Sequence, residues 1–177
     1  VLVTMHRRES FERHLEDMCE GVLGVLDKVP DAVVLLPVHT NPRVQEVIAS
    51  QMMLGRRRLL VTQPLKADVF PFVLKHASLV MTDSGGVQEE AVSLGKALMV
   101  MREATERPEA VEVGNAVVSG RDRDRIESLA VSILTNRSLF DRMSRARFPY
   151  GYGNASIIIG GVLAAFHSGA PPPYPPA

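Results

Sequence analysis

An α/β fold with a mostly parallel sheet, covered by helices on both faces, is predicted by three features of the sequence. Short apolar or β-branched runs recur at residues 1–4, 32–36, 59–62, 78–82, 97–101 and 116–119. Most segments between them have the apolar periodicity of helices. The runs are apolar throughout rather than alternating, as expected for strands buried on both faces. With right-handed crossovers, this order predicts a doubly wound, Rossmann-like domain.

The first two strands are each followed by a helical pattern. Residues 12–27 carry a broad apolar stripe that includes Met18 and Cys19, both interpreted as core or boundary residues. His39 follows the second strand and is expected to help cap the helix that begins near Pro42. Residues 56–58, three arginines before the third strand, lie at the opposite edge of the sheet and are interpreted as a solvated turn.

The fourth strand, at residues 78–82, runs into a turn that could bind an anion. Ser84 can cap the following helix, and Gly85 and Gly86 have no Cβ to block a ligand. Because the first N–H groups of a helix have no intrahelical partners, this turn can hold a phosphate. Glu90, one turn further along, could reach hydroxyl groups of the same ligand. A plain strand-to-helix turn remains an equal alternative.

Charged loops follow the first and fifth strands. The first contains His6 and Arg7, and the second contains Glu106, Arg107 and Glu109. In an open α/β sheet, ligands bind outside the carboxyl ends of the strands, so both loops should share an edge with Ser84. Arginine can bind two phosphate oxygens at once, and the two acids suit acid/base work or contacts to sugar hydroxyls. Solvated helix starts are the structural alternative.

The C-terminal part predicts two or three helices between residues 125 and 166, interrupted at 148–153. We expect one domain over residues 1–167 and a Pro-rich tail over 168–177 that is disordered or polyproline II. Because the chain starts with Val1 inside an apolar run, we also expect it to be a piece of a longer protein.

Composition excludes several classes of partner. Among 177 residues, Lys+Arg and Asp+Glu balance at 20 each, which argues against nucleic acid and against a polybasic membrane surface. No apolar run reaches the ~18 to 20 residues of a membrane span, and nothing resembles a signal peptide. A single Cys19 suits a reducing, cytoplasmic location. The sequence contains neither the residue spacing of a metal site nor the glycine pattern of a dinucleotide-binding site, so no cofactor is expected.

Five ordered motifs resemble those of the non-hydrolysing UDP-N-acetylglucosamine 2-epimerases. They are VTMHRRE at 3–9, PVHTNP at 37–42, TDSGGVQEEA at 82–91, TERPE at 105–109, and NAS at 154–156 after PYG at 149–151. The resemblance covers residues 1–166 and implies the C-terminal, UDP-binding half of a two-domain, glycosyltransferase-B-like enzyme. Such enzymes interconvert UDP-GlcNAc and UDP-ManNAc by eliminating UDP to a glycal and adding it back.

The resemblance also implies roles for individual residues. Ser84, Gly85 and Gly86 would hold the diphosphate, Glu90 the ribose hydroxyls, and Phe70 would lie against the uracil. His6 would be the catalytic residue near the scissile bond, and Arg107 would contact the nucleotide-sugar. This chain has Ala67 where the family usually has Tyr, Met5 where it usually has Gly, and Tyr152 where it often has Asp.

The acids that move the C2 proton belong to the family's N-terminal domain, which is absent from this chain. We therefore expect the isolated chain to bind UDP without epimerising it, to need that N-terminal domain as its partner, and to form a homodimer when full length. A glycosyltransferase-B-type sugar transferase, a silent UDP-sugar-binding module, and the hydrolysing epimerases remain alternatives.

Overall fold

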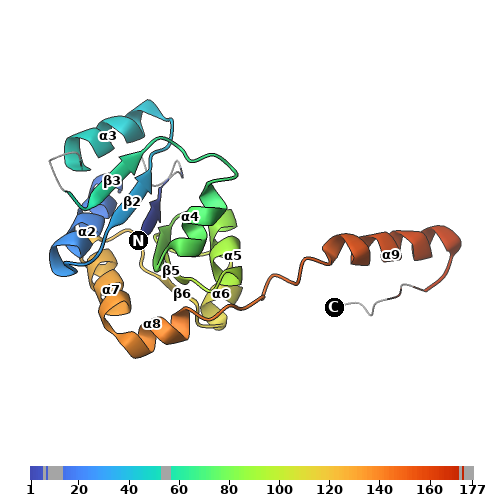
Figure 1. Ribbon diagram of the computed structural model, residues 1–177. Coiled ribbons are helices and arrows are strands. Elements are labelled where there is room, and N and C mark those ends of the chain that lie inside the picture. Colours follow the sequence, from blue (N-terminus) through green and yellow to red (C-terminus); the bar gives the residue numbers. More distant parts are fainter. Residues whose placement is uncertain (6, 8–13, 53–56, 172, 174–177) are drawn as a thin grey trace. The chain divides into compact units, whose positions relative to one another are not determined.

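The computed structural model describes residues 1–5, 7, 14–52, 57–171 and 173 (Figure 1). The chain divides into two compact units, Val1–Arg147 and Phe148–Ala177. The first unit contains the sheet and the helices that cover it. Within the described residues, the second unit contains one helix, α9 (Ala155–Ser168).

The sheet of the first unit has six strands in the order β3-β2-β1-β4-β5-β6, with every neighbouring pair parallel. Their bounds are β1 (Leu2–Thr4), β2 (Val34–Pro37), β3 (Leu59–Thr62), β4 (Leu79–Thr82), β5 (Ala97–Val100) and β6 (Ala116–Val118). The predicted parallel, doubly wound sheet is confirmed. The chain winds outward from β1 to β3, then returns to the other side of β1 for β4, so the direction of winding switches between β1 and β4.

Helices cover the sheet on both faces (Figure 1). One face carries α2 (Leu15–Lys28), α3 (Pro42–Met52), α7 (Arg123–Thr135) and α8 (Arg137–Met143). The other carries α4 (Phe70–His76), α5 (Gly85–Ser93) and α6 (Pro108–Glu112). Because side chains alternate along a strand, Met81 and Met99 join the core with α2 and α7, while Val80 and Leu98 are buried outside that cluster.

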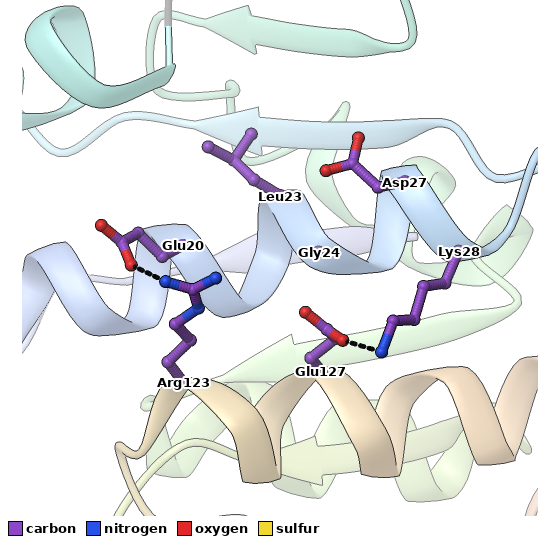
Figure 2. Close-up of a pocket in the computed structure, with 7 residues that line it drawn as sticks. All are labelled: Glu20, Leu23, Gly24, Asp27, Lys28, Arg123 and Glu127. Atoms are coloured by element: carbon purple, nitrogen blue, oxygen red, sulfur yellow. Dashed lines mark hydrogen bonds and ion pairs between the residues drawn. The ribbon is translucent and has the colours of Figure 1, made fainter.

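Helices α2 and α7 pack against each other, and two glycines of α2 permit their close approach. A Cβ on Gly21 would lie 2.9 Å from the backbone oxygen of Arg123, and one on Gly24 would meet the Glu127 carboxylate. At the edge of the contact, Arg123 pairs with Glu20 at 2.6 Å and Glu127 pairs with Lys28, around a pocket of about 240 Å³ (Figure 2). These contacts make the pocket a helix-packing feature held by ion pairs.

Arg58 lies in the turn before β3, but its side chain is half-buried and hydrogen-bonded, so the prediction of a solvated turn is wrong for this side chain; Arg56 lies outside the described residues. Its guanidinium donates hydrogen bonds to the carbonyl oxygens of Leu26, Val29 and Ala32. The last carbonyl groups of a helix have no intrahelical partner, and a cation there also interacts favourably with the negative end of the helix dipole. Arg58 therefore ties the end of α2 to the start of β3.

Cys19 is buried in the core, as predicted. Burial, together with the nearby charges of Glu16 and Glu20, raises the pKa of its thiol to about 12. The thiol is therefore protonated at neutral pH and unsuited to be a nucleophile.

The sequence predicts one domain over residues 1–167, and the boundary between the two compact units, between Arg147 and Phe148, lies inside that span. The predicted domain bounds stay a prediction. Within the second unit, α9 carries the apolar residues Ile157, Leu163 and Phe166. Residues 172 and 174–177 of the predicted Pro-rich tail lie outside the described residues, so its predicted disorder stays a prediction.

Candidate functional site

The N-terminus of α5 lies at the switch point of the sheet and is capped by a side chain. Ser84 is the N-cap, and its Oγ accepts a hydrogen bond from the Val87 N–H. Thr82 Oγ1 accepts from the Ser84 N–H at 3.0 Å and pairs with Thr4 Oγ1 at 2.6 Å, which joins the ends of β4 and β1. A Cβ on Gly86 would meet no atom of the described residues within 4 Å, so these residues leave the first N–H groups of α5 accessible, as an anion site requires.

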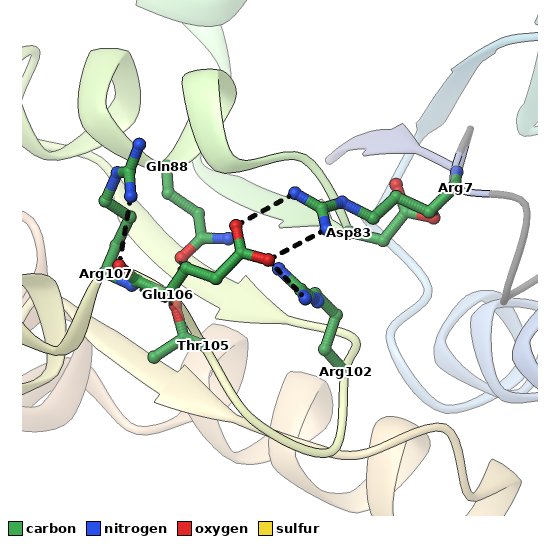
Figure 3. A network of polar contacts seen from close by, with 7 residues as sticks. All are labelled: Arg7, Asp83, Gln88, Arg102, Thr105, Glu106 and Arg107. Carbon is green, nitrogen blue, oxygen red and sulfur yellow. Dashed lines mark hydrogen bonds and ion pairs between the residues drawn. The ribbon is translucent and has the colours of Figure 1, made fainter.

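Two arginines meet one carboxylate beside this helix start (Figure 3). Arg7 binds Glu106 through both terminal nitrogens, at 3.0 and 3.1 Å, and Arg102 binds the same carboxylate at 3.0 Å. These hydrogen bonds, first from Arg7 and then from Arg102, lower the pKa of Glu106 to about 2. The Arg7 backbone is itself anchored, because its N–H donates to the buried Asp83 carboxylate at 3.0 Å. Arg7, Arg102 and Glu106 together carry one net positive charge, and the Asp83 carboxylate beside them offsets it.

The loop after β5 is fastened to α5 by a second set of contacts. Thr105 Oγ1 donates to the buried Gln88 Oε1 at 2.6 Å and accepts from the Arg107 N–H at 3.0 Å. The Arg107 side chain pairs with Glu89. Arg107 is thereby held on α5 one residue before Glu90, which is exposed.

A pocket of about 360 Å³ opens at the carboxyl ends of β1 and β2 and the loop after β3. Phe70 lines it at the start of α4, and the other lining residues are Thr4, Met5, Pro37, Val38, His39, Thr40, Pro64 and Leu65. An apolar wall with a few polar groups suits a planar base. Thr4 connects this pocket to the anion site, because the end of β1 contributes to both.

The structure thus brings together most of the residues that the sequence singled out. Ser84, Gly85, Gly86 and Glu90 lie on α5, with Arg107 fastened to the same helix. The capping role of Ser84 is confirmed, while the assigned ligand contacts stay predictions. Phe70 lies in the neighbouring pocket. His6, the predicted catalytic residue, lies outside the described residues.

Several residues of the site were missed by sequence reasoning. His39 was interpreted as a capping residue, and its Nδ1 does accept from the Asn41 N–H at 3.1 Å, yet it also lines the pocket. Pro64 and Leu65 line it too, from a loop to which no role was assigned. Their position after the third strand was the available signal, because ligands gather at carboxyl ends.

The described part of the chain contains neither a candidate metal site nor a candidate membrane-spanning helix. There, no three His, Cys, Asp or Glu side chains come together in a way that could hold a metal ion. Likewise, none of the helices among the described residues has the length and apolar character needed to cross a membrane.

Comparison with known proteins identifies one family. The sequence profile described as UDP-N-acetylglucosamine 2-epimerase matches residues 1–164. A protein from Ralstonia solanacearum named "Probable UDP-N-acetylglucosamine 2-epimerase" is 41% identical over 166 residues, which are 94% of this chain and 44% of that protein. This chain therefore spans less than half the length of that relative.

Solved structures agree with this match. The "S. aureus MnaA-UDP co-structure" has a TM-score of 0.90 at 33% identity and covers 98% of this chain and 48% of that one. The UDP-GlcNAc 2-epimerase from Neisseria meningitidis, bound to UDP-GlcNAc, has a TM-score of 0.87 at 32% identity and covers 92% of this chain and 44% of that one.

Proposed function

The chain belongs to the UDP-N-acetylglucosamine 2-epimerase family, and on that premise we propose that it is the UDP-binding half of a non-hydrolysing UDP-GlcNAc 2-epimerase. The whole protein would interconvert UDP-GlcNAc and UDP-ManNAc. The observation that carries the proposal is the open, Ser84-capped start of α5 beside the pocket lined by Phe70.

The two parts of the site suit the two ends of UDP. Parallel strands lie about 4.8 Å apart, so the ends of β2 and β4, with β1 between them, are roughly 10 Å apart. The ribose and phosphates of a nucleotide can span that distance. The uracil would lie against Phe70, the diphosphate at Ser84, Gly85 and Gly86, and the ribose hydroxyls near Glu90.

The chemical role of this half is to stabilise the leaving group. Removal of the C2 proton and cleavage of the C1–O bond give a glycal and place negative charge on UDP. The N–H groups at the start of α5 would already be oriented toward that charge, so they would stabilise it most when the bond breaks. Re-addition of UDP, with the proton returned to the other face of C2, completes the epimerisation.

We place the proton-transferring acids outside this chain rather than on Glu106 or Glu109. Glu106 is the most prominent carboxylate at the site, but a pKa of about 2 makes it a weak base. It also faces the ligand from the nucleotide side, on the same edge as Ser84. The proposed acids therefore belong to the domain that the longer relatives have and this chain does not contain.

Two measurements test the proposal. The chain of residues 1–177 should bind UDP by calorimetry and be stabilised by UDP in a thermal melt, yet leave UDP-GlcNAc unexchanged in deuterated water. The full-length protein should exchange the C2 proton of UDP-GlcNAc for deuterium and form UDP-ManNAc. A sugar transferase or a silent binding module would leave C2 unexchanged, and a hydrolysing enzyme would release free ManNAc.

The proposal extends to the whole protein's assembly and location. We expect a homodimer for the full-length protein, which light scattering coupled to size exclusion measures directly. A cytoplasmic location is supported by the buried, protonated thiol of Cys19, which has no disulfide partner in this sequence. Fractionation of the source cells would test it.

A further inference from the structure

Glu106 stands out at the proposed UDP site because it is a negative charge where a diphosphate should bind. Its carboxylate is half exposed, whereas the side chains of Arg7 and Arg102 are 28% and 10% exposed. The contact between Arg7 and Glu106 joins residues that lie 99 positions apart in the sequence. An ordinary phosphate site has cations and N–H groups but no carboxylate among them.

The distances place both Arg7 and Glu106 against the first residue of α5. A Cβ on Gly85 would lie 3.7 Å from Arg7 Nη2 and 3.9 Å from Glu106 Oε2. A phosphate held by the first N–H groups of α5 would therefore approach the guanidinium that it attracts and the carboxylate that repels it. Since the pKa of Glu106 is about 2, the carboxylate is charged at every pH at which the protein would work.

We infer that Glu106 is an internal counter-ion of Arg7, which the diphosphate of the nucleotide displaces. This inference rests on the proposed function of the site. In the ligand-free protein Glu106 neutralises and orients Arg7. On binding, the Arg7 guanidinium turns from Glu106 to a phosphate oxygen, while the more buried Arg102 stays with Glu106.

The fixed frame around Arg7 makes this exchange possible without rebuilding the site. The Arg7 N–H is held by Asp83, and Asp83 directly precedes Ser84, so the backbone of Arg7 keeps its place beside α5. Only the guanidinium needs to turn. Glu106 therefore acts through Arg7 as a positioning residue, and its remaining charge limits the affinity for the nucleotide.

The test compares Glu106→Gln with the wild-type chain in calorimetric titrations of UDP and of uridine. Removing one negative charge about 5 Å from the phosphates should tighten UDP binding by roughly three- to tenfold at low salt. The gain should shrink toward zero near 1 M salt, where the screening length is about 3 Å. Uridine has no phosphate, so its affinity should not change.

Glu103→Gln is the matched control. Glu103 lies in the same loop but faces Gly120, so its replacement removes the same charge away from Arg7 and should change UDP affinity by less than about twofold. A thermal melt without ligand checks that each variant is folded, and Glu106→Ala repeats the charge removal with a smaller side chain.

The possible outcomes separate the two proposals. Tighter UDP binding by both Glu106 variants, with unchanged uridine binding, supports the exchange. Equal or weaker UDP binding by folded Glu106→Gln overturns it and makes Glu106 a structural partner of the arginines. Absence of UDP binding by the folded wild-type chain would refute the UDP site itself.

Discussion

Gly21→Ala and Gly24→Ala should have opposite effects on stability, although both lie on α2 and face α7. At Gly21, the new Cβ would lie 2.8 Å from Ile126 Cγ2 and 2.9 Å from the Arg123 backbone oxygen. Neither atom can move without shifting α7. At Gly24, the three atoms nearest to the new Cβ all belong to the Glu127 side chain, and that flexible side chain can turn away.

The magnitudes follow from two opposing effects. Replacing glycine by alanine inside a helix stabilises by about 0.5–1 kcal/mol at either position. Overpacking at Gly21 lowers the free energy of unfolding by about 1–3 kcal/mol, so the net effect of Gly21→Ala is a loss of stability of about 1 kcal/mol. At Gly24, the ion pair between Lys28 and Glu127 is lost; the Lys28 end of this pair is 62% exposed, and ion pairs open to solvent contribute at most about 1 kcal/mol. Gly24→Ala should therefore be neutral or stabilising by up to about 1 kcal/mol.

Thermal unfolding followed by circular dichroism measures the difference. With about 2–4 °C per kcal/mol for a protein of this size, Gly24→Ala should melt about 2–8 °C above Gly21→Ala. If the two variants melt together, or if Gly24→Ala is the less stable, the assignment of backbone contact at Gly21 and side-chain contact at Gly24 is wrong.

Four other outcomes are expected. Ser84→Ala should weaken UDP binding by about 1 kcal/mol and Arg107→Met by about 2–3 kcal/mol in calorimetry, because the second loses a charged donor. Asn115→Ala should destabilise the fold by about 2–4 kcal/mol in urea titrations, since the buried Nδ2 donates to two carbonyl oxygens at 2.7 Å. The pKa of Glu106 is lowered from 4.5 to about 2 in the folded chain, so its stabilising effect should be present above pH 4.5 and be lost as the pH falls toward 2. The stability difference between wild type and Glu106→Gln should shrink accordingly, and a difference unchanged at pH 3 would contradict this. Cys19 should react with a thiol reagent only after denaturant is added, because burial raises its pKa to about 12.

The strands and the capped turn could be predicted because local sequence determines them. Each predicted strand lies within two residues of an observed one, since continuous apolar runs mark strands buried on both faces. Ser84 before two glycines predicted the start of α5 for the same reason: a cap depends on the residues next to it.

Contacts between distant residues could not be predicted in this way. Nothing near Arg7 in the sequence indicates that Glu106 will bind it, because that pair depends on how β1, β4 and β5 are ordered. Arg58 is a similar case, since a run of arginines before a strand gives no sign that one of them ends α2. His39 both accepts a hydrogen bond from the Asn41 N–H and lines the pocket beside Phe70, and only the local, capping role was predicted.

The central position of β1 has a consequence for synthesis on the ribosome. β1 is the first strand of this chain to be made, yet its two neighbours are β2 and β4, and its pairing with β4 requires residues up to Thr82. Until those residues leave the exit tunnel, one edge of an apolar strand has no partner and is open to pairing with other nascent chains. A chaperone that binds apolar segments should therefore associate with nascent chains until Thr82 has left the exit tunnel and dissociate from longer ones, which ribosome profiling of chaperone-bound chains can detect.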